Sequence, residues 1–543
     1  MTPDPSGAEI ITAAVAPASV PAGARSAPLL LLIILTATAL RLWHLDSVPL
    51  GLHNDEAWTG INAREVLRDG WIGPYLYPSG LGQPSGPVYF TALLFTLVPQ
   101  TSFTLRLSMA LFGIATVALT YAVGRAMFDR TTGLFAAALL AIMPWHLHLS
   151  RTAFMVGAWP FIEMAILWTL FRARARPSIW KFAIVGFLIG LGVYTYNAYP
   201  LFLLVVAVPF IYDLMAARDG TARRRWLAHT AAAAITALWA TLPMLHYAAE
   251  HQEYSWHHRD VSVLSRDEWK QAGWVARADM LAARGAEWAK GVTVGGRPDD
   301  GDGLGQHGHP LLDPLTAVAA LAGTVMAVRR WRRPQYAVLL AALLVLPFGA
   351  LLTTDDGLYR RTFGLTPFIA LLAALSLSWL WRQALASRGI WRAALAGGMV
   401  LAIAAAGVRN AEAYFTPLQQ ASGIRYVYPY QVDAAARAIA RLPAGTVVYF
   451  YSDRWGAGFE TIRWLAPDAT MIDRSREFRQ SIAPDAPLDL SADAMGPSAF
   501  ALMGNYLDIV KALRARYPAA VVTEEELDGE ILYRLVRVEV PPP

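Results

Sequence analysis

The chain has 543 residues, of which 55% are hydrophobic and only 16% are charged. This composition is too apolar for a soluble protein of this length and indicates a multi-spanning α-helical membrane protein. In such a protein the formal net charge of +5 reflects membrane topology first, so it gives no reason to expect a nucleic-acid partner. The chain contains no cysteine, which excludes disulfides, thiolate catalysis and Cys-ligated metals.

The N-terminal segment, residues 1–27, is rich in Ala, Pro and Ser, which predicts a disordered tail. The first apolar run, 28–42, follows it. The run contains the small-x-small pattern Ala37-Thr38-Ala39, which is also found at signal-peptide cleavage sites. Because acidic residues precede the run and basic residues are scarce there, we expect a retained membrane anchor instead.

Ten further apolar runs approach the length of about 20 residues that a transmembrane helix needs. They lie at 103–123, 131–147, 158–171, 179–196, 199–215, 227–246, 311–328, 335–353, 363–381 and 391–408. The run Val88–Val98 is too short to cross and predicts a helix in the membrane interface. Residues 28–408 are therefore predicted to form a transmembrane domain of about eleven helices.

Basic residues gather in five short links between these runs. The links are GRAMFDR, RARARPSIWK, AARDGTARRRW, RRWRRP and WRQALASRGIWR. Eleven spans place all five on one side of the membrane, and the positive-inside rule makes that side the cytoplasm. We therefore expect a multi-pass protein of the cell membrane, plasma or inner, with a cytoplasmic N-terminus and an external or periplasmic C-terminal part.

The C-terminal segment, 409–543, changes its periodicity from residue 429 onward. QVDAAARAIARL and NYLDIVKALRARYP are typical of helices, whereas TVVYFYS, AAVVTEEEL and ILYRLVRVEV are typical of strands. This pattern predicts a small external α/β domain. Its sequence contains no phosphate loop, nucleophile elbow or paired acids, so we expect an ancillary role.

Adjacent carboxylates, Asp55 and Glu56, occur in the first external loop, within LGLHNDEAWTGINAREVLRDG. One interpretation is structural: Asn54 or Asp55 caps a helix that runs to Arg68, and Glu56 complements the positive end of its dipole. The other is catalytic. Asp55 would be a general base at the membrane surface, which accepts a proton from an acceptor hydroxyl or amine, with Glu56 beside it.

Four arginines break the charge rule, because they map to the outer ends of helices on the same face as Asp55. They are Arg106, Arg151, Arg360 and Arg361. Ion pairs, for example with Asp355 or Asp356, or snorkelling to headgroups would explain them. The functional alternative is a set of guanidinium groups that bind a phosphate, which Arg suits better than Lys.

Aromatic and amide side chains add to this outer face in two segments, YTYNAYP and YPSGLGQPSGPVYF. Sugar stacking or hydrogen bonding would use them as substrate ligands. The candidates, with a histidine of the first loop, are His53, Gln83, Tyr194, Tyr196 and Asn197. The alternative for tyrosines at this depth is an ordinary aromatic belt.

Histidines and aspartates in the segment 247–310 allow a divalent metal site, zinc or manganese. They are His251, His257, His258, Asp299, Asp300, Asp302, His307 and His309. Their spacing matches neither an H-E-x-x-H helix nor a complete calcium loop, so we favour a solvated loop and expect no required metal or other cofactor.

Taken in order, seven segments resemble the GT-C class of polyprenyl-phosphate-sugar-dependent glycosyltransferases, in the branch of protein O-mannosyltransferases and lipid A aminoarabinose transferases. The segments are HNDEAWTGINAREVLRDG, RLSMALFG, GRAMFDR, PWHLHLSR, YTYNAYP, LGQHGHPLLDPL and YRRTFGLTPFIALLAA. The likeness covers about residues 28–410.

The resemblance implies an inverting sugar transfer at the outer face, from a polyprenyl-phosphate donor to a protein, glycan or lipid acceptor. It implies Asp55 as the base, with Glu56 beside it, and basic residues that hold the donor phosphate. One departure concerns the second external loop, where family members commonly have an acidic residue shortly after Ser-Arg. Here Ser150-Arg151 is followed by Thr-Ala-Phe-Met-Val-Gly, and Glu163 lies deep in the next predicted helix.

Two other classes of function compete with a glycosyltransferase. A transporter or flippase of lipid-linked sugars usually has ionisable groups near mid-membrane on broken helices, often in repeated halves, and the sequence shows neither pattern. A non-catalytic envelope assembly protein would leave Asp55 and the outer arginines without a role.

Overall fold

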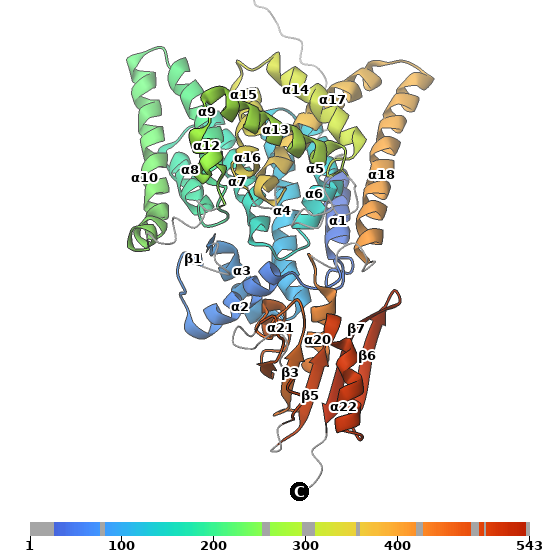
Figure 1. Cartoon of the computed structure of the whole chain (residues 1–543). Coiled ribbons are helices and arrows are strands. Elements are labelled where there is room, and N and C mark those ends of the chain that lie inside the picture. The colour runs from blue at the N-terminus through green and yellow to red at the C-terminus, as the bar shows by residue number, and fades with distance from the viewer. Residues whose placement is uncertain are drawn as a thin grey trace, which may run out of the picture.

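The computed structural model describes residues 27–76, 82–251, 261–295, 310–354, 359–419, 427–478, 488–492 and 496–538. A helical body forms the upper part of the molecule in Figure 1, and a five-stranded sheet with its own helices lies below it. Several residues of the sequence predictions fall outside the described residues. These are the tail up to residue 26, Asp355 and Asp356, and His257, His258, Asp299, Asp300, Asp302, His307 and His309.

The apolar runs form helices where the sequence predicts them. They are α1 (Ala27–Leu42), α4 (Ser102–Met127), α5 (Arg130–Ile142), α7 (Trp159–Ala175), α8 (Ile179–Gly192), α9 (Pro200–Ala216), α10 (Gly220–Glu250), α14 (Pro314–Val328), α15 (Pro334–Val345), α17 (Thr366–Ala386) and α18 (Ile390–Gln419). Among the described residues, five helical segments are long and apolar enough to cross a membrane, and further apolar helices of 10–17 residues accompany them. The helical body is thus that of a multi-pass membrane protein, while the number of spans stays a prediction.

Short polar side chains mark where several of these helices begin. Thr101, Asp129, Asp219 and Asp313 each accept a hydrogen bond from a backbone N–H in the first turn of α4, α5, α10 and α14. Such N-caps satisfy backbone donors that have no partner within the helix. The caps explain why these helices start just after the loop residues and not earlier in the chain.

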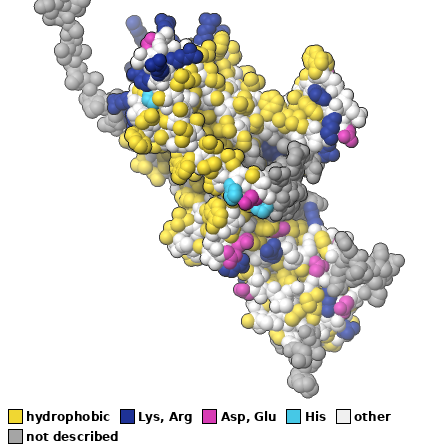
Figure 2. Space-filling view, turned by 90° about the vertical axis from the view of Figure 1, so that its left-hand side faces the viewer, with side chains coloured by type: hydrophobic (Ala, Val, Ile, Leu, Met, Phe, Trp, Pro, Cys, Tyr) yellow, Lys and Arg dark blue, Asp and Glu magenta, His cyan; other side chains and the backbone are white. Residues whose placement is uncertain are grey.

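The two ends of the helical body differ in charge. The connections α9–α10, α14–α15 and α17–α18 lie at its top in Figure 1, opposite α2 and the sheet. Figure 2 shows Lys and Arg side chains gathered at this top end, above a broad hydrophobic side surface. These three basic connections therefore share one end of the molecule, and the side of the membrane that this end faces stays a prediction.

Between α1 and α4 the chain forms α2 (Asn54–Asp69), a short hairpin of β1 (Tyr75–Leu76) and β2 (Gln83–Pro84), and α3 (Gly86–Leu97). A helix of 12 residues is about 18 Å long, and the hydrocarbon core is about 30 Å thick. α3 is thus shorter than the hydrocarbon core, and its place in the membrane interface stays a prediction.

The segment 247–310, predicted as a solvated loop, contains regular structure where it is described. It forms η2 (Val263–Ser265), α12 (Asp267–Gln271) and α13 (Trp274–Thr293). The prediction of a loop is therefore wrong for residues 274–293. These residues, WVARADMLAARGAEWAKGVT, are rich in Ala and in long charged side chains, which have high helix propensity. The prediction relied on long apolar runs and therefore did not detect this more polar helix.

The C-terminal residues fold as α20 (Tyr430–Ile439), β3 (Val447–Tyr451), α21 (Glu460–Leu465), β4 (Thr470–Asp473), β5 (Ser498–Leu502), η5 (Gly504–Ile509), α22 (Val510–Arg516), β6 (Val521–Leu527) and β7 (Glu530–Val538). The strand order is β4-β3-β5-β7-β6. β3 pairs in parallel with β4 and β5, whereas β7 pairs antiparallel with β5 and β6. The part is therefore α/β, as predicted, although the sequence did not reveal β4, β5 or α21.

One aromatic contact joins the sheet part to α2. A Cβ at Gly60 would lie 2.6 Å from the ring of Trp464, so only glycine lets α21 approach this closely. The Arg64 guanidinium lies 3.7 Å from the centroid of the Trp464 ring and donates a 2.9 Å hydrogen bond to its carbonyl oxygen. The C-terminal part thus rests on the helix that begins with Asn54, Asp55 and Glu56.

Candidate active site

The N-terminus of α2 is capped by a histidine. His53 Nδ1 accepts a 3.0 Å hydrogen bond from the backbone N–H of Asp55, and the Glu56 carboxylate accepts a 3.1 Å bond from the backbone N–H of His53. These two bonds form a capping box. The interpretation of Asn54 or Asp55 as the cap is therefore wrong, because both lie inside the first turn. The Asp55 carboxylate is not needed to start the helix.

Glu56 is buried in an ion pair with Arg106. Arg106 Nε and Nη2 lie 2.8 and 3.0 Å from the two carboxylate oxygens, and neither side chain is more than 1% exposed. The remaining Arg106 donors bond the carbonyl oxygens of Leu45, Pro49 and Gly51. Since every N–H of this guanidinium has a partner within the protein, the predicted phosphate contact of Arg106 is not supported. The Glu56 carboxylate likewise bonds groups of the protein, including the backbone N–H of Ala153 at 2.8 Å.

Arg151 is also engaged by the backbone. Its two terminal nitrogens donate to the carbonyl oxygens of Leu40, Arg41, His44 and Val48, at 2.8 to 3.2 Å. Leu40 and Arg41 belong to the last turn of α1, where carbonyl groups lack helical partners and a positive charge complements the dipole. Arg151 thus ties α1 to the second outer loop and does not line the cavity of Asp55 described below, so its predicted contact with a phosphate has no support from these bonds.

Other predicted residues converge on one cavity of about 580 Å³. Asp55 comes from α2, and Arg360 and Arg361 from η4 (Arg360–Leu365). Gln83, Tyr196 and Asn197 also line it, as do the apolar residues Phe154, Leu201, Leu204 and Phe348. Six of the eleven predicted site residues therefore share one cavity, although they come from four distant parts of the chain.

An ion pair crosses this cavity wall. Arg360 Nη1 donates to Asp55 Oδ2 at 2.6 Å, and both side chains are 20% exposed. The Arg360 guanidinium also lies 4.8 Å from the ring centroid of Phe154. This phenylalanine also packs edge-on against His53. Phe154 was not among the site residues predicted from the sequence. Its place in the second external loop, three residues after Arg151, could have indicated that it lies near the other candidates.

The charges around Asp55 favour its ionised form. Burial opposes ionisation, but the neighbouring His53 and Arg360 together lower the pKa of Asp55 below its ordinary value. Burial lowers the pKa of His53 and so favours its neutral imidazole, whose Nδ1 accepts a hydrogen bond from the backbone N–H of Asp55. Arg360, which donates a hydrogen bond to Asp55, is the neighbour of this carboxylate that stays charged.

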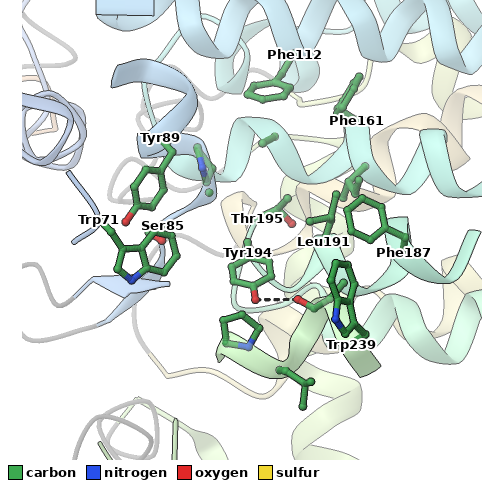
Figure 3. Close-up of a pocket in the computed structure, with 17 residues that line it drawn as sticks. Trp71, Ser85, Tyr89, Phe112, Phe161, Phe187, Leu191, Tyr194, Thr195 and Trp239 are labelled. Atoms are coloured by element: carbon green, nitrogen blue, oxygen red, sulfur yellow. Dashed lines mark hydrogen bonds between the residues drawn. The ribbon is translucent and has the colours of Figure 1, made fainter. Parts of the chain in front are cut away.

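The predicted substrate ligands have different surroundings. Asn197 donates a 2.8 Å bond to the Gly82 carbonyl oxygen and so fastens the β1–β2 hairpin to the cavity. The Tyr196 ring stacks on Trp159, with centroids 5.4 Å apart. Tyr194 lines a different, apolar hollow, shown in Figure 3, where its hydroxyl donates to the Ala240 carbonyl oxygen. The structure thus separates Tyr194 from the six predicted residues that line the cavity of Asp55.

The described part of the chain contains few of the predicted metal ligands. No group of three or more His, Asp or Glu side chains occurs within it. His251, the one described member of the predicted loop set, packs its ring against Tyr247. The buried Glu163 of α7 lies among Trp159 and Gly364 and does not line the cavity of Asp55.

Comparisons with known proteins agree with this architecture. Residues 83–247 match the family model for dolichyl-phosphate-mannose-protein mannosyltransferases. No curated protein matches the sequence significantly. Among solved structures, ArnT from Cupriavidus metallidurans bound to undecaprenyl phosphate aligns with a TM-score of 0.55 at 15% identity, over 95% of this chain and 100% of that chain.

A second relative by fold is the archaeal oligosaccharyltransferase AglB from Archaeoglobus fulgidus, in complex with an inhibitory peptide and a dolichol-phosphate. It aligns with a TM-score of 0.51 at 16% identity, over 94% of this chain and 74% of that chain. The protein therefore has the fold of GT-C glycosyltransferases. The matched family model and these neighbours confirm the predicted resemblance to that class, and with it the predicted class of enzyme.

Proposed function

We propose that this protein transfers a sugar from a polyprenyl-phosphate donor to an acceptor hydroxyl or amine at the outer or periplasmic face of the membrane, with inversion. The observation that carries the proposal is the Asp55–Arg360 ion pair in the wall of a cavity that also holds Arg361. It unites a carboxylate base with two phosphate-binding groups. The ArnT and AglB neighbours, which were solved with lipid phosphates, support the choice of donor.

Arg360 and Arg361 are the proposed ligands of the donor phosphate. A guanidinium offers paired donors that match phosphate oxygens. Because Arg360 Nη1 bonds Asp55, a phosphate that draws Arg360 toward itself weakens this pair. The Asp55 carboxylate is then free to meet the acceptor. Donor binding thus prepares the base.

The chemical step needs only these groups. The acceptor O–H or N–H gives its proton to Asp55, and the acceptor atom attacks C1 of the sugar from the side opposite the phosphate. The C1–O bond breaks, and its electron pair leaves on the polyprenyl phosphate. This leaving group is already a stable anion, so charge neutralisation by the arginines matters more than protonation.

An assay of transfer tests the proposal. Purified protein would be incubated with radiolabelled sugars on polyprenyl phosphate, as a panel, and with extracted cell-envelope fractions. At least one donor should label an envelope component, and the same sugar on a nucleotide diphosphate should not. Labelling from the nucleotide sugar alone would refute the proposal.

A further inference from the structure

The second hollow lies between α3, α4, α7, α8 and α10 (Figure 3). Its volume is about 650 Å³, which lies within the range of ligand pockets. Apolar side chains form most of its lining, chiefly Phe112, Phe161, Phe187, Leu191, Trp239 and Leu242. The hollow is therefore suited to hydrocarbon.

The membrane side of this hollow is formed by α8 and α10. Leu191, Trp239 and Leu242 on these helices are 36%, 64% and 49% exposed, so they face lipid when the helices span. Lipid tails are as apolar as these side chains, and association there depends on shape and van der Waals contact. Binding of a hydrocarbon chain in the hollow thus depends on the fit between chain and hollow, since transfer of the chain out of the bilayer brings little gain.

A thin partition separates the hollow from the cavity of Asp55. Three short segments contribute residues to both sides: Gln83 against Ser85 and Gly86, Val156 against Ala158, and Tyr196 and Asn197 against Tyr194 and Thr195. The backbone N–H of Gly86 donates a 3.0 Å bond to the Tyr194 carbonyl oxygen, which ties two of these segments together. A molecule in the hollow therefore lies directly behind the candidate active site.

The chain of the donor has a separate path. Beyond Arg360 and Arg361, the cavity of Asp55 is lined by Leu201 and Leu204 of α9 and by Phe348 of α16 (Phe348–Leu351). Leu204 is 61% exposed, so this wall reaches the lipid-facing surface. A polyprenyl chain whose phosphate lies at the arginines can leave along α9. The hollow across the partition remains for another substrate.

The mouth of the hollow carries markers of the membrane surface. Trp71 stacks on Tyr89, with ring centroids 5.0 Å apart, and the Tyr89 hydroxyl donates to the Gly73 carbonyl oxygen at 2.9 Å. Trp and Tyr gather at headgroup depth. A lipid chain in the hollow would thus place its headgroup near the partition.

From these observations we infer that the hollow binds a hydrocarbon chain of the acceptor, and that the acceptor is therefore a membrane lipid with a hydroxyl or amine in its headgroup. This inference rests on the proposed sugar transfer. The acceptor chain would then lie on the opposite side of the partition from the donor, with its headgroup at the edge of the partition, beside the cavity of Asp55. Binding of the acceptor chain then orients the acceptor atom toward the sugar. Such orientation can supply much of the lowering of the activation barrier in a reaction of two substrates.

The test uses variants with a narrower hollow and measures their kinetics with the donor and with the acceptor. Leu242→Trp fills the hollow from α10, and Leu191→Trp fills it from α8. Leu401→Trp on α18 is the matched control, because Leu401 is 70% exposed and belongs to the opposite side of the helical body (Figure 1). Transfer would be measured with the active labelled donor, and with two acceptors: total envelope lipid extract and delipidated envelope protein.

We expect label in the lipid extract. Leu242→Trp or Leu191→Trp should lower kcat/KM for the lipid acceptor about tenfold or more and leave KM for the donor unchanged. The control variant should match wild type in both quantities. Label in delipidated protein only, a rise in donor KM instead, or wild-type kinetics in both folded variants would overturn the inference while the proposed transfer stands. Absence of transfer to either fraction from every donor would refute the proposed function itself.

Discussion

Arg360 Nη1 lies 2.6 Å from Asp55 Oδ2, although 305 residues separate the two in the sequence. The contact joins η4 to the first turn of α2. It pairs the proposed base with a proposed phosphate ligand before either meets its substrate. A donor phosphate and Asp55 would therefore compete for one guanidinium, which couples donor binding to release of the base.

Removal of this charge should change the pH dependence of activity. Asp55 acts as a base only when ionised, so the rate falls as the pH drops through its pKa. Arg360 lowers that pKa, and Arg360→Gln should raise it. The acid limb of the kcat/KM profile should thus move to higher pH, in addition to a loss of donor affinity.

The control for this profile is Arg382→Gln. Arg382 lies in α17, outside the cavity, and its substitution removes an ion pair with Asp129. Its acid limb should coincide with that of wild type. An unchanged limb in Arg360→Gln would show that another group titrates.

Glu56 should prove to be a structural residue. Glu56→Gln leaves the buried Arg106 charge without its partner, and such a change typically costs about 3–5 kcal/mol. We expect a clear fall in Tm in detergent. Asp69→Asn on the same helix breaks an exposed pair with Arg68, and because such surface pairs contribute little to stability, its Tm should stay close to that of wild type. A Glu56→Gln variant with wild-type Tm but little turnover would instead assign Glu56 to the chemistry.

Trp464 should couple the C-terminal part to α2. Trp464→Ala removes a buried ring that packs on Gly60 and stacks on Phe95, at a cost of about 3–5 kcal/mol. Limited proteolysis should then cut the C-terminal part faster. The control Trp274→Ala removes a ring that is 81% exposed and should behave as wild type. Equal proteolysis of the two variants would argue against the contact.

Sequence patterns predicted the helical body well because each apolar run is a local property of the chain. The arginines show where this reasoning ends. Arg106 and Arg360 both break the charge rule, but only tertiary packing makes the first 1% and the second 20% exposed at the side chain. No local signal separates a guanidinium that bonds loop carbonyls from one that faces a cavity.

The cap of α2 and the short strands have similar explanations. Histidine is not among the preferred N-cap residues, so Asn54 and Asp55 looked more suitable than His53. β4 has four residues and β5 has five, all buried. Runs this short carry little periodicity, and their pairing with β3 supplies the structure.

The topology prediction concerns all eleven apolar helices. Reporter fusions after Arg125, Arg176, Arg225, Arg333 and Arg388 should all report the cytoplasm, because each site lies in a basic link. A fusion at the C-terminus should report the exterior. External signals at two or more of the five link sites would contradict the arrangement of eleven spans.

The central claim is that Asp55 takes the proton of the acceptor, and turnover of Asp55→Asn tests it most directly. His53 is the cap, so asparagine should leave α2 folded although the charge pair with Arg360 is lost, yet it cannot accept the proton. At saturating donor, turnover from the polyprenyl-phosphate sugar should fall by about 10² to 10⁴. Near-normal turnover by a stably folded Asp55→Asn variant would contradict the assignment of the base.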